Sequence, residues 1–132
     1  LSKRKIDSKT CYTIFPTATI FLLRTTYENA LLSIIKKKKL YNQFQKNVKN
    51  KEMPTLSEME SFVANNDNIN VIFSDPSVKK VFEYIKGENF RTLTNNVVHN
   101  ISNCKIHSSQ LEHFAQSGLF SIFQYIIEEL KK

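Results

Sequence analysis

The spacing of apolar residues constrains the fold of this chain more than any other feature of its sequence. From Leu23 onward these residues recur at steps of three and four, a period that places them on one face of an α-helix. Only two glycines and three prolines interrupt the 132 residues, which disfavours the turn-rich sandwiches and barrels. The sequence therefore predicts an all-α fold of six to seven short helices, packed as an irregular bundle or as a stack of helical hairpins.

The predicted helical domain covers residues 17–132. Residues 1–16 form a basic N-terminal segment that we expect to be extended or poorly ordered. Pro16 suits the entrance of the first helix. The apolar spacing continues on both sides of the run Lys36 to Lys39, which allows one long helix or two. We favour two helices with a joint at the lysines.

Capping residues predict where the next helices begin. Thr55 and Glu58 have the spacing of a capping box, in which each side chain bonds the backbone of the other residue. Asp75 can cap a further helix, with Pro76 at its first position. Between these two starts, the segment from Asn65 to Asn68 is predicted to be a loop.

Three features punctuate the second half of the chain. The triplet Val71, Ile72 and Phe73 is the only segment where a strand competes with a helix, and a lone strand would lack a partner. Gly87 is expected to end one helix, and Gly118 fits a left-handed stop. The last helix is expected to run from Leu119 to Leu130, with apolar residues that we assign to the core.

The stretch from Leu93 to Ile127 resembles an armadillo repeat boundary, an example of the armadillo/HEAT-like helical repeats. In that family an asparagine-containing turn, a helix ending in a small residue and glycine, and an apolar helix follow one another. Asn100 to Asn103, Ala115 to Gly118 and Leu119 to Ile127 match these parts in order. The resemblance implies an armadillo-like interaction scaffold without a catalytic centre, and no functional residue is carried over.

The segment Phe73 to Val78, with the helix that continues to Ile85, resembles the Asp-Pro helical modules of co-chaperones. Aspartate before proline also occurs for capping reasons alone. This second resemblance likewise implies a helical interaction scaffold, and it marks no ligand-binding position.

Positive charge is concentrated in the first part of the chain. Residues 1–51 carry twelve Lys or Arg against two acids, whereas residues 52–132 carry seven against ten. Such polarity is expected of a protein that lays one end on a phosphate backbone or on an acidic partner. It can also serve solubility alone.

The lysine run is the main candidate for a contact site. Its four residues cover every face of a helical turn, so at least two of them must point away from any core. Bound to RNA or DNA, such groups give salt-sensitive affinity without sequence preference, while the alternative is a solvated run that marks a joint. The candidate contact residues for nucleic acid or an acidic partner are Lys3, Arg4, Lys5, Lys9, Lys36, Lys37, Lys38, Lys39, Lys46 and Lys49.

Signs of catalytic or metal chemistry are few. His99, Cys104 and His107, with His113 nearby, allow a three-ligand zinc site or a Cys-His pair, but we favour surface histidines and a packed thiol. We therefore expect no enzyme activity, cofactor or metal.

The remaining acidic pairs do not suggest a catalytic centre either. Glu58 with Glu60, and Glu128 with Glu129, are expected on exposed helix faces as solvating charge.

The function expected from these features is a non-catalytic protein-protein interaction or scaffold module, and a subunit or fragment of a larger assembly is one form that such a module takes. The alternative is an RNA- or DNA-contacting component. The ten phenylalanines raise the prospect of an exposed aromatic patch where a partner helix docks.

The apolar run Ile20 to Leu23 is too short for a membrane span. The widely spaced Cys11 and Cys104 suggest reduced thiols in an intracellular, reducing compartment. The oligomeric state stays open.

Overall fold

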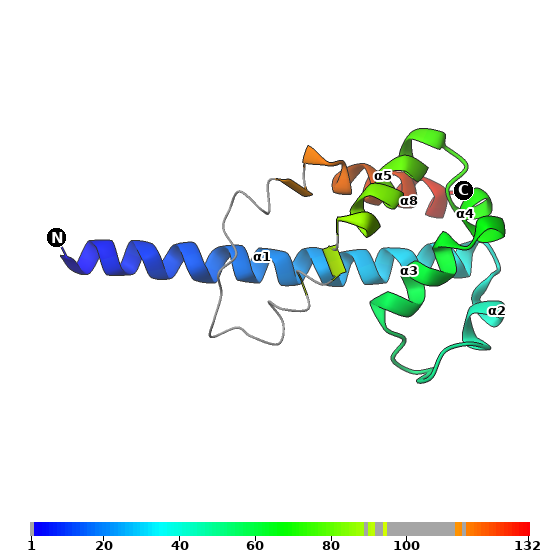
Figure 1. The fold of residues 1–132 in the computed structure, drawn as a ribbon, viewed down its shortest axis with the longest axis horizontal. Coiled ribbons are helices and arrows are strands. Elements are labelled where there is room, and N and C mark those ends of the chain that lie inside the picture. The colour runs from blue at the N-terminus through cyan, green and yellow to red at the C-terminus, as the bar shows by residue number, and fades with distance from the viewer. Residues whose placement is uncertain (1, 89, 92–93, 95–112, 115) are drawn as a thin grey trace.

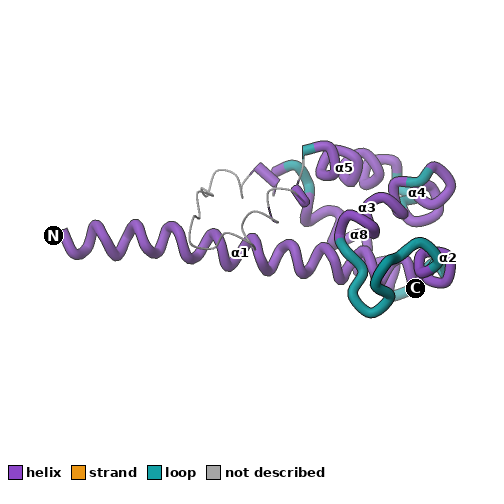
Figure 2. Tube along the Cα trace, turned by 60° about the horizontal axis from the view of Figure 1, so that its bottom comes forward, coloured by secondary structure: helices purple, strands orange, loops and turns teal. Residues whose placement is uncertain are grey.

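The computed structural model describes residues 2–88, 90–91, 94, 113–114 and 116–132, with residues 2–18 described by their backbone alone. Within these ranges the chain is all-α and contains no strand, which confirms the predicted fold class (Figures 1 and 2). The described helices are α1 (Ser2–Lys37), α2 (Tyr41–Gln45), α3 (Leu56–Ala64), α4 (Asn66–Ile72), α5 (Pro76–Gly87) and α8 (Leu119–Leu130).

Helix α1 is the axis of the molecule. Its C-terminal half packs against α3 and α8, while its N-terminal half extends beyond the other described helices (Figure 1). The helix begins at Ser2 and passes through Pro16, whereas the sequence indicated an extended segment over 1–16 and a helix start after the proline. Residues 2–15 contain no glycine or proline and are compatible with a helix. Pro16 removes one backbone donor from this helix but does not end it.

The predicted joint at the lysine run is confirmed. Lys39 takes the left-handed conformation with φ 62°. The backbone N–H of Leu40 donates to the carbonyl of Ile35 at 3.0 Å, and that of Lys39 donates to Lys36 at 3.0 Å. These two bonds make a Schellman motif, which satisfies the last carbonyls of α1 and turns the chain toward α2.

Helix α3 begins with the predicted capping box. The Glu58 backbone N–H donates to Thr55 Oγ1 at 3.2 Å, and the Thr55 N–H donates to Glu58 Oε1 at 3.1 Å. Helix α5 also begins as predicted, because Asp75 accepts a hydrogen bond from the Ser77 N–H at 2.8 Å and Pro76 is the first helical residue. It ends at Gly87, in agreement with the sequence.

The predicted loop from Asn65 to Asn68 is wrong, because α4 begins at Asn66. The Asn65 side chain caps this helix by accepting a hydrogen bond from the Asp67 N–H at 3.2 Å. Ile69 and Ile72 are buried, so a short helix with one apolar face replaces the strand considered at Val71 to Phe73. Asparagine therefore acts here as a helix cap rather than as a loop residue.

The core is built around aromatic rings. Tyr27 meets Phe90 edge-on with ring centroids 5.4 Å apart, and Phe90 meets Phe114 at 4.9 Å. Phe73 and Phe82 bring α4 and α5 together, with centroids 5.1 Å apart. The first two of these pairs join parts of the chain that are far apart in sequence, and the third joins consecutive helices.

The two glycines provide a matched test of this backbone. Gly118 has φ 100°, and a Cβ there would lie 3.0 Å from Val81 Cγ1, whereas a Cβ at Gly87 would meet nothing within 4 Å. Gly118→Ala should lower the free energy of unfolding by about 1–3 kcal/mol. Gly87→Ala should raise it by up to about 1 kcal/mol. Urea denaturation measures both changes, and shifts of the same sign would contradict the assigned backbone conformations.

Candidate functional site

Helix α8 carries apolar residues on more than one face. Gly118 in its left-handed conformation precedes the helix, which then buries Leu119, Ile122 and Ile126 against α1 and α5. A surface helix usually buries one apolar stripe and exposes polar residues on the opposite side. In α8 the apolar residues cover a wider arc around the helix than the part that the fold buries.

The exposed part of this arc is the candidate functional site. Phe120, Ile127 and Leu130 are 54%, 47% and 41% exposed, and the half-buried Phe123 lies between them on the same side. The rings of Phe120 and Phe123 meet edge-on with centroids 6.0 Å apart. The spacing of three, four and three residues aligns all four side chains along the helix. We call these four residues the α8 stripe.

Tyr125 fixes the orientation of α8. Its hydroxyl donates to the carbonyl of Ile72 at 3.0 Å and accepts from the Ser74 N–H at 3.1 Å. Its ring also packs against Phe73, with centroids 5.6 Å apart. Because these contacts hold the opposite side of α8 against the end of α4 and the residues that follow it, the α8 stripe is kept at the surface.

Glu129 joins the ends of α1 and α8. Its two carboxylate oxygens accept hydrogen bonds from Lys38 Nζ and Lys132 Nζ, each at 3.0 Å. These bonds, from Lys132 and then Lys38, hold the pKa of Glu129 below its usual range. Six lysines therefore gather where the two helices end, and we call Lys36 to Lys39 with Lys131 and Lys132 the basic end.

The predicted basic residues divide into two groups. The backbone of Lys3, Arg4, Lys5 and Lys9 lies at the N-terminal end of α1, and their side chains lie outside the described residues. At 1.5 Å per residue, Lys9 and Lys36 are about 40 Å apart along the helix. The structure therefore does not bring the candidate lysines together in one patch.

The other predicted lysines lie close to α2. Lys36 Nζ stands 4.8 Å from the ring centroid of Tyr41. Lys46 and Lys49 are exposed at the end of α2 and in the loop after it, where the Lys49 backbone N–H donates to Glu58 Oε2 at 3.1 Å. Lys131 and Lys132 were not among the sequence candidates, because only the fold brings them to Lys38.

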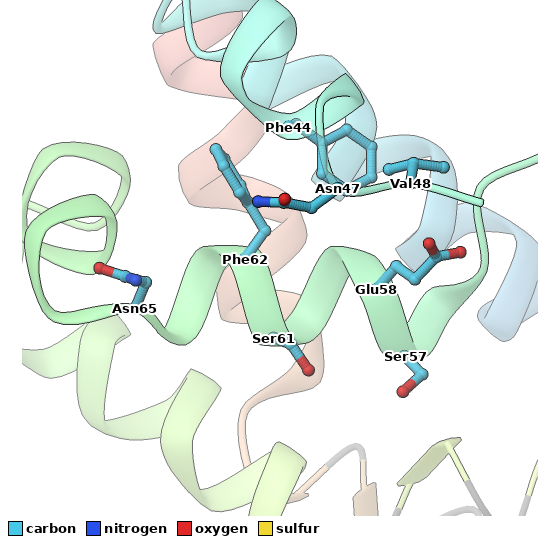
Figure 3. Close-up of a pocket in the computed structure, with 8 residues that line it drawn as sticks. All are labelled: Phe44, Asn47, Val48, Ser57, Glu58, Ser61, Phe62 and Asn65. Atoms are coloured by element: carbon cyan, nitrogen blue, oxygen red, sulfur yellow. The ribbon is translucent and has the colours of Figure 1, made fainter. Parts of the chain in front are cut away.

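A groove lies between α2 and α3 (Figure 3). It has a volume of about 340 Å³, and Phe44 and Phe62 meet in it with ring centroids 5.2 Å apart. Glu58, the acid in its wall, has a lowered pKa because hydrogen bonds from Thr55 and Lys49 stabilise its charged form. That carboxylate is already used to cap α3. The groove is lined by Phe44, Asn47, Val48, Ser57, Glu58, Ser61, Phe62 and Asn65.

The expected exposure of two glutamates is wrong. Glu60 and Glu129 are buried, at 3% and 8% exposure. Glu60 Oε2 accepts a hydrogen bond from the Tyr27 hydroxyl at 3.1 Å, and Arg91 Nε lies 3.9 Å from Glu60 Oε1. Burial raises the pKa of Glu60 despite these partners. The three-and-four spacing of apolar residues in α3 did not reveal that Glu60 faces α1.

Part of the histidine and cysteine cluster can be placed. His113 Nε2 lies 3.5 Å from the Tyr84 hydroxyl and 3.8 Å from Glu88 Oε2. His99, Cys104 and His107 lie outside the described residues. Among the residues that are described, no group of three or more His, Cys, Asp or Glu could hold a metal ion.

A comparison of the chain with protein-family models, curated proteins and solved structures found no match. The likenesses to armadillo repeats and to co-chaperone modules therefore stay predictions. In the described part of the chain, no helix is long and apolar enough to cross a membrane.

Proposed function

We propose that this chain is a non-catalytic helical interaction module that binds another protein through the α8 stripe. The observation that carries the proposal is the second apolar face of α8, where Phe120, Ile127 and Leu130 stay 41–54% exposed. Contiguous exposed apolar side chains are typical of binding surfaces. A partner helix could cover them with anchors at its own three-and-four spacing.

The rigidity of the site supports this proposal. On the side of α8 opposite the stripe, the Tyr125 hydroxyl forms hydrogen bonds with the backbone of Ile72 and Ser74. At the end of the helix, Glu129 accepts a hydrogen bond from Lys38. A surface that is already ordered loses less conformational entropy on binding. The stripe therefore combines apolar area with a fixed shape.

Site-specific photocrosslinking tests the proposed function. We expect a photoreactive phenylalanine analogue at Phe120, in cells that express this chain, to give one discrete and saturable protein adduct. The same analogue at the adjacent Ser121, which points to the polar side of α8, should not give it. Adding Ile127→Ser should abolish the adduct at Phe120. Equal labelling from both positions, or no adduct at all, would contradict the proposal.

A second candidate function is contact with the phosphate backbone of RNA or DNA. The observation that favours it is the meeting of Lys38 and Lys132 at Glu129, with the exposed Lys131 next to them in the chain. Binding of a generic RNA should then weaken steeply as salt rises, since each phosphate contact releases counterions. Undetectable binding at low salt would remove this candidate.

A further inference from the structure

The α8 stripe runs directly into the basic end. Helices α1 and α8 point in the same direction, and the hydrogen bond from Lys38 to Glu129 joins their C-terminal ends (Figure 1). Leu130, the last residue of the stripe, stands between Glu129 and Lys131 in the chain. Lys131, the αR C-cap of α8, follows Ile127 by four residues and so lies one turn beyond it on the side of the stripe. A ligand that covers Ile127 and Leu130 therefore lies beside Lys131.

The positive charge of the basic end is only partly neutralised. Glu129 serves both Lys38 and Lys132, and the neighbouring Glu128 accepts a hydrogen bond from Gln124 Nε2 at 2.9 Å. Lys37, Lys39 and Lys131 are exposed and form no ion pair with any residue that the structure describes. The surface thus offers unpaired cations beside an apolar stripe.

Lys39 adds an independent observation. Its φ of 62° lies in the left-handed region, where glycine is the usual residue at the end of a helix and a side chain costs stability. A lysine at this position is a local disadvantage for the fold. Strain of this kind is commonly found where a side chain serves binding.

We infer that the occupant of the α8 stripe is an acidic amphipathic helix of a partner protein, whose apolar face covers the stripe and whose carboxylates meet the basic end. This inference rests on the proposed function and adds the chemistry of the partner to it. Complementary charge speeds encounter and fixes the orientation of such a helix. Nucleic acid would use the lysines but leave Phe120 and Ile127 uncovered.

An anionic membrane surface fits the stripe less well than a helix does. About half of each stripe side chain is covered by the fold itself, since Phe120, Ile127 and Leu130 are 54%, 47% and 41% exposed. Such side chains form a shallow surface, whereas an interfacial helix buries its whole apolar face below the lipid headgroups. In α8 the most apolar side of the helix, with Leu119, Ile122 and Ile126, is already buried in the core of the fold and cannot enter a membrane.

Two designed peptides test the partner chemistry. Both carry leucines on one helical face, and the other face carries glutamates in one peptide and lysines in its control. Fluorescence anisotropy with the full chain should show that the glutamate peptide binds at least about tenfold more tightly at low salt. The difference should shrink as salt screens the charges. Equal affinities, or no binding of either peptide, would overturn the inference.

Variants separate the two parts of the surface. Lys39→Gly should raise the unfolding midpoint, because glycine relieves the left-handed strain, and yet weaken the glutamate peptide several-fold. Lys51→Gly makes the same change in an exposed loop outside the basic end and should leave that affinity unchanged. Ile127→Ser should weaken both peptides. A glutamate preference that survives Lys39→Gly and is insensitive to salt would overturn the inference.

The inference and the proposed function can fail separately. Partner crosslinking from Phe120 without any preference for the glutamate peptide would leave the interaction module standing and reject its acidic partner. Binding to anionic vesicles that Ile127→Ser abolishes, with no binding of the glutamate peptide, would assign the stripe to a membrane surface instead. Self-association that Ile127→Ser disrupts, again without peptide binding, would assign it to a second copy of the chain.

Discussion

Replacing Phe82 by alanine should lower the free energy of unfolding by about 3–5 kcal/mol. Phe82 is fully buried at 0% exposure, and its ring lies 5.1 Å from that of Phe73 between centroids. The substitution removes this ring pair and leaves a cavity where α4 and α5 meet. Chemical denaturation monitored by circular dichroism gives the loss directly.

The matched control is Phe120→Ala in the α8 stripe. The same atoms are removed from a side chain that is 54% exposed, so water fills the space and no cavity forms. The expected loss is below about 1 kcal/mol. Comparable losses for the two variants would show that Phe120 belongs to the core, and the proposed docking surface would then be abandoned.

Tyr27→Phe should cost about 1–3 kcal/mol at neutral pH. Burial raises the pKa of the Tyr27 hydroxyl, which therefore stays protonated and donates to Glu60. Phenylalanine keeps the ring and its contact with Phe90 but leaves the buried carboxylate with one partner fewer. Thermal unfolding of both proteins in the same buffer measures the difference, and an unchanged stability would contradict the role of this hydrogen bond.

The raised pKa of Glu60 also makes the free energy of unfolding depend on pH. The folded state holds the Glu60 proton more tightly than the unfolded chain, where the pKa is about 4.3. This group therefore favours folding most below that pH, and its contribution is lost as pH rises through the folded pKa. Glu60→Gln keeps an acceptor for Tyr27 and should flatten this part of the stability profile. A profile unchanged by Glu60→Gln would contradict the assignment.

Local signals were sufficient to predict much of the fold. The capping box of Thr55 and Glu58, the Asp75 cap and the left-handed Gly118 depend on residues within a few positions of one another. The joint after the lysine run also follows from local spacing. Such features are visible in sequence because their physical cause lies within one turn of helix.

Features that depend on distant packing were not predicted. Ile127 and Leu130 were assigned to the core because they share the apolar spacing of α8, yet they are 47% and 41% exposed. The signal available was the width of the apolar arc, since Phe120 and Ile122 are two positions apart and lie on nearly opposite sides of the helix, where one neighbouring face cannot cover both. Which side is covered depends on where α1 and α5 lie.

The burial of Glu60 and Glu129 has the same origin. Glu60 finds Tyr27 across the interface between α3 and α1, and Glu129 finds Lys38 across the interface between α8 and α1. Each partner lies far away in sequence, so periodicity alone gives no reason to bury a carboxylate. The lysines of the basic end meet for the same reason, since Lys36 to Lys39 lie in the first third of the chain and Lys131 and Lys132 are its last two residues.

The most direct test of the central claim is the chemical accessibility of two adjacent positions in α8. In a chain with Cys11→Ser and Cys104→Ser, the variants Ile126→Cys and Ile127→Cys place a thiol at sites that are 1% and 47% exposed. Their reaction rates with a small thiol reagent are then compared under native conditions. We predict that the thiol at position 127 reacts nearly as fast as in the unfolded chain, while that at 126 must await opening of the fold and reacts at least about a hundredfold more slowly. Equal protection of both thiols would show that α8 has no free apolar face.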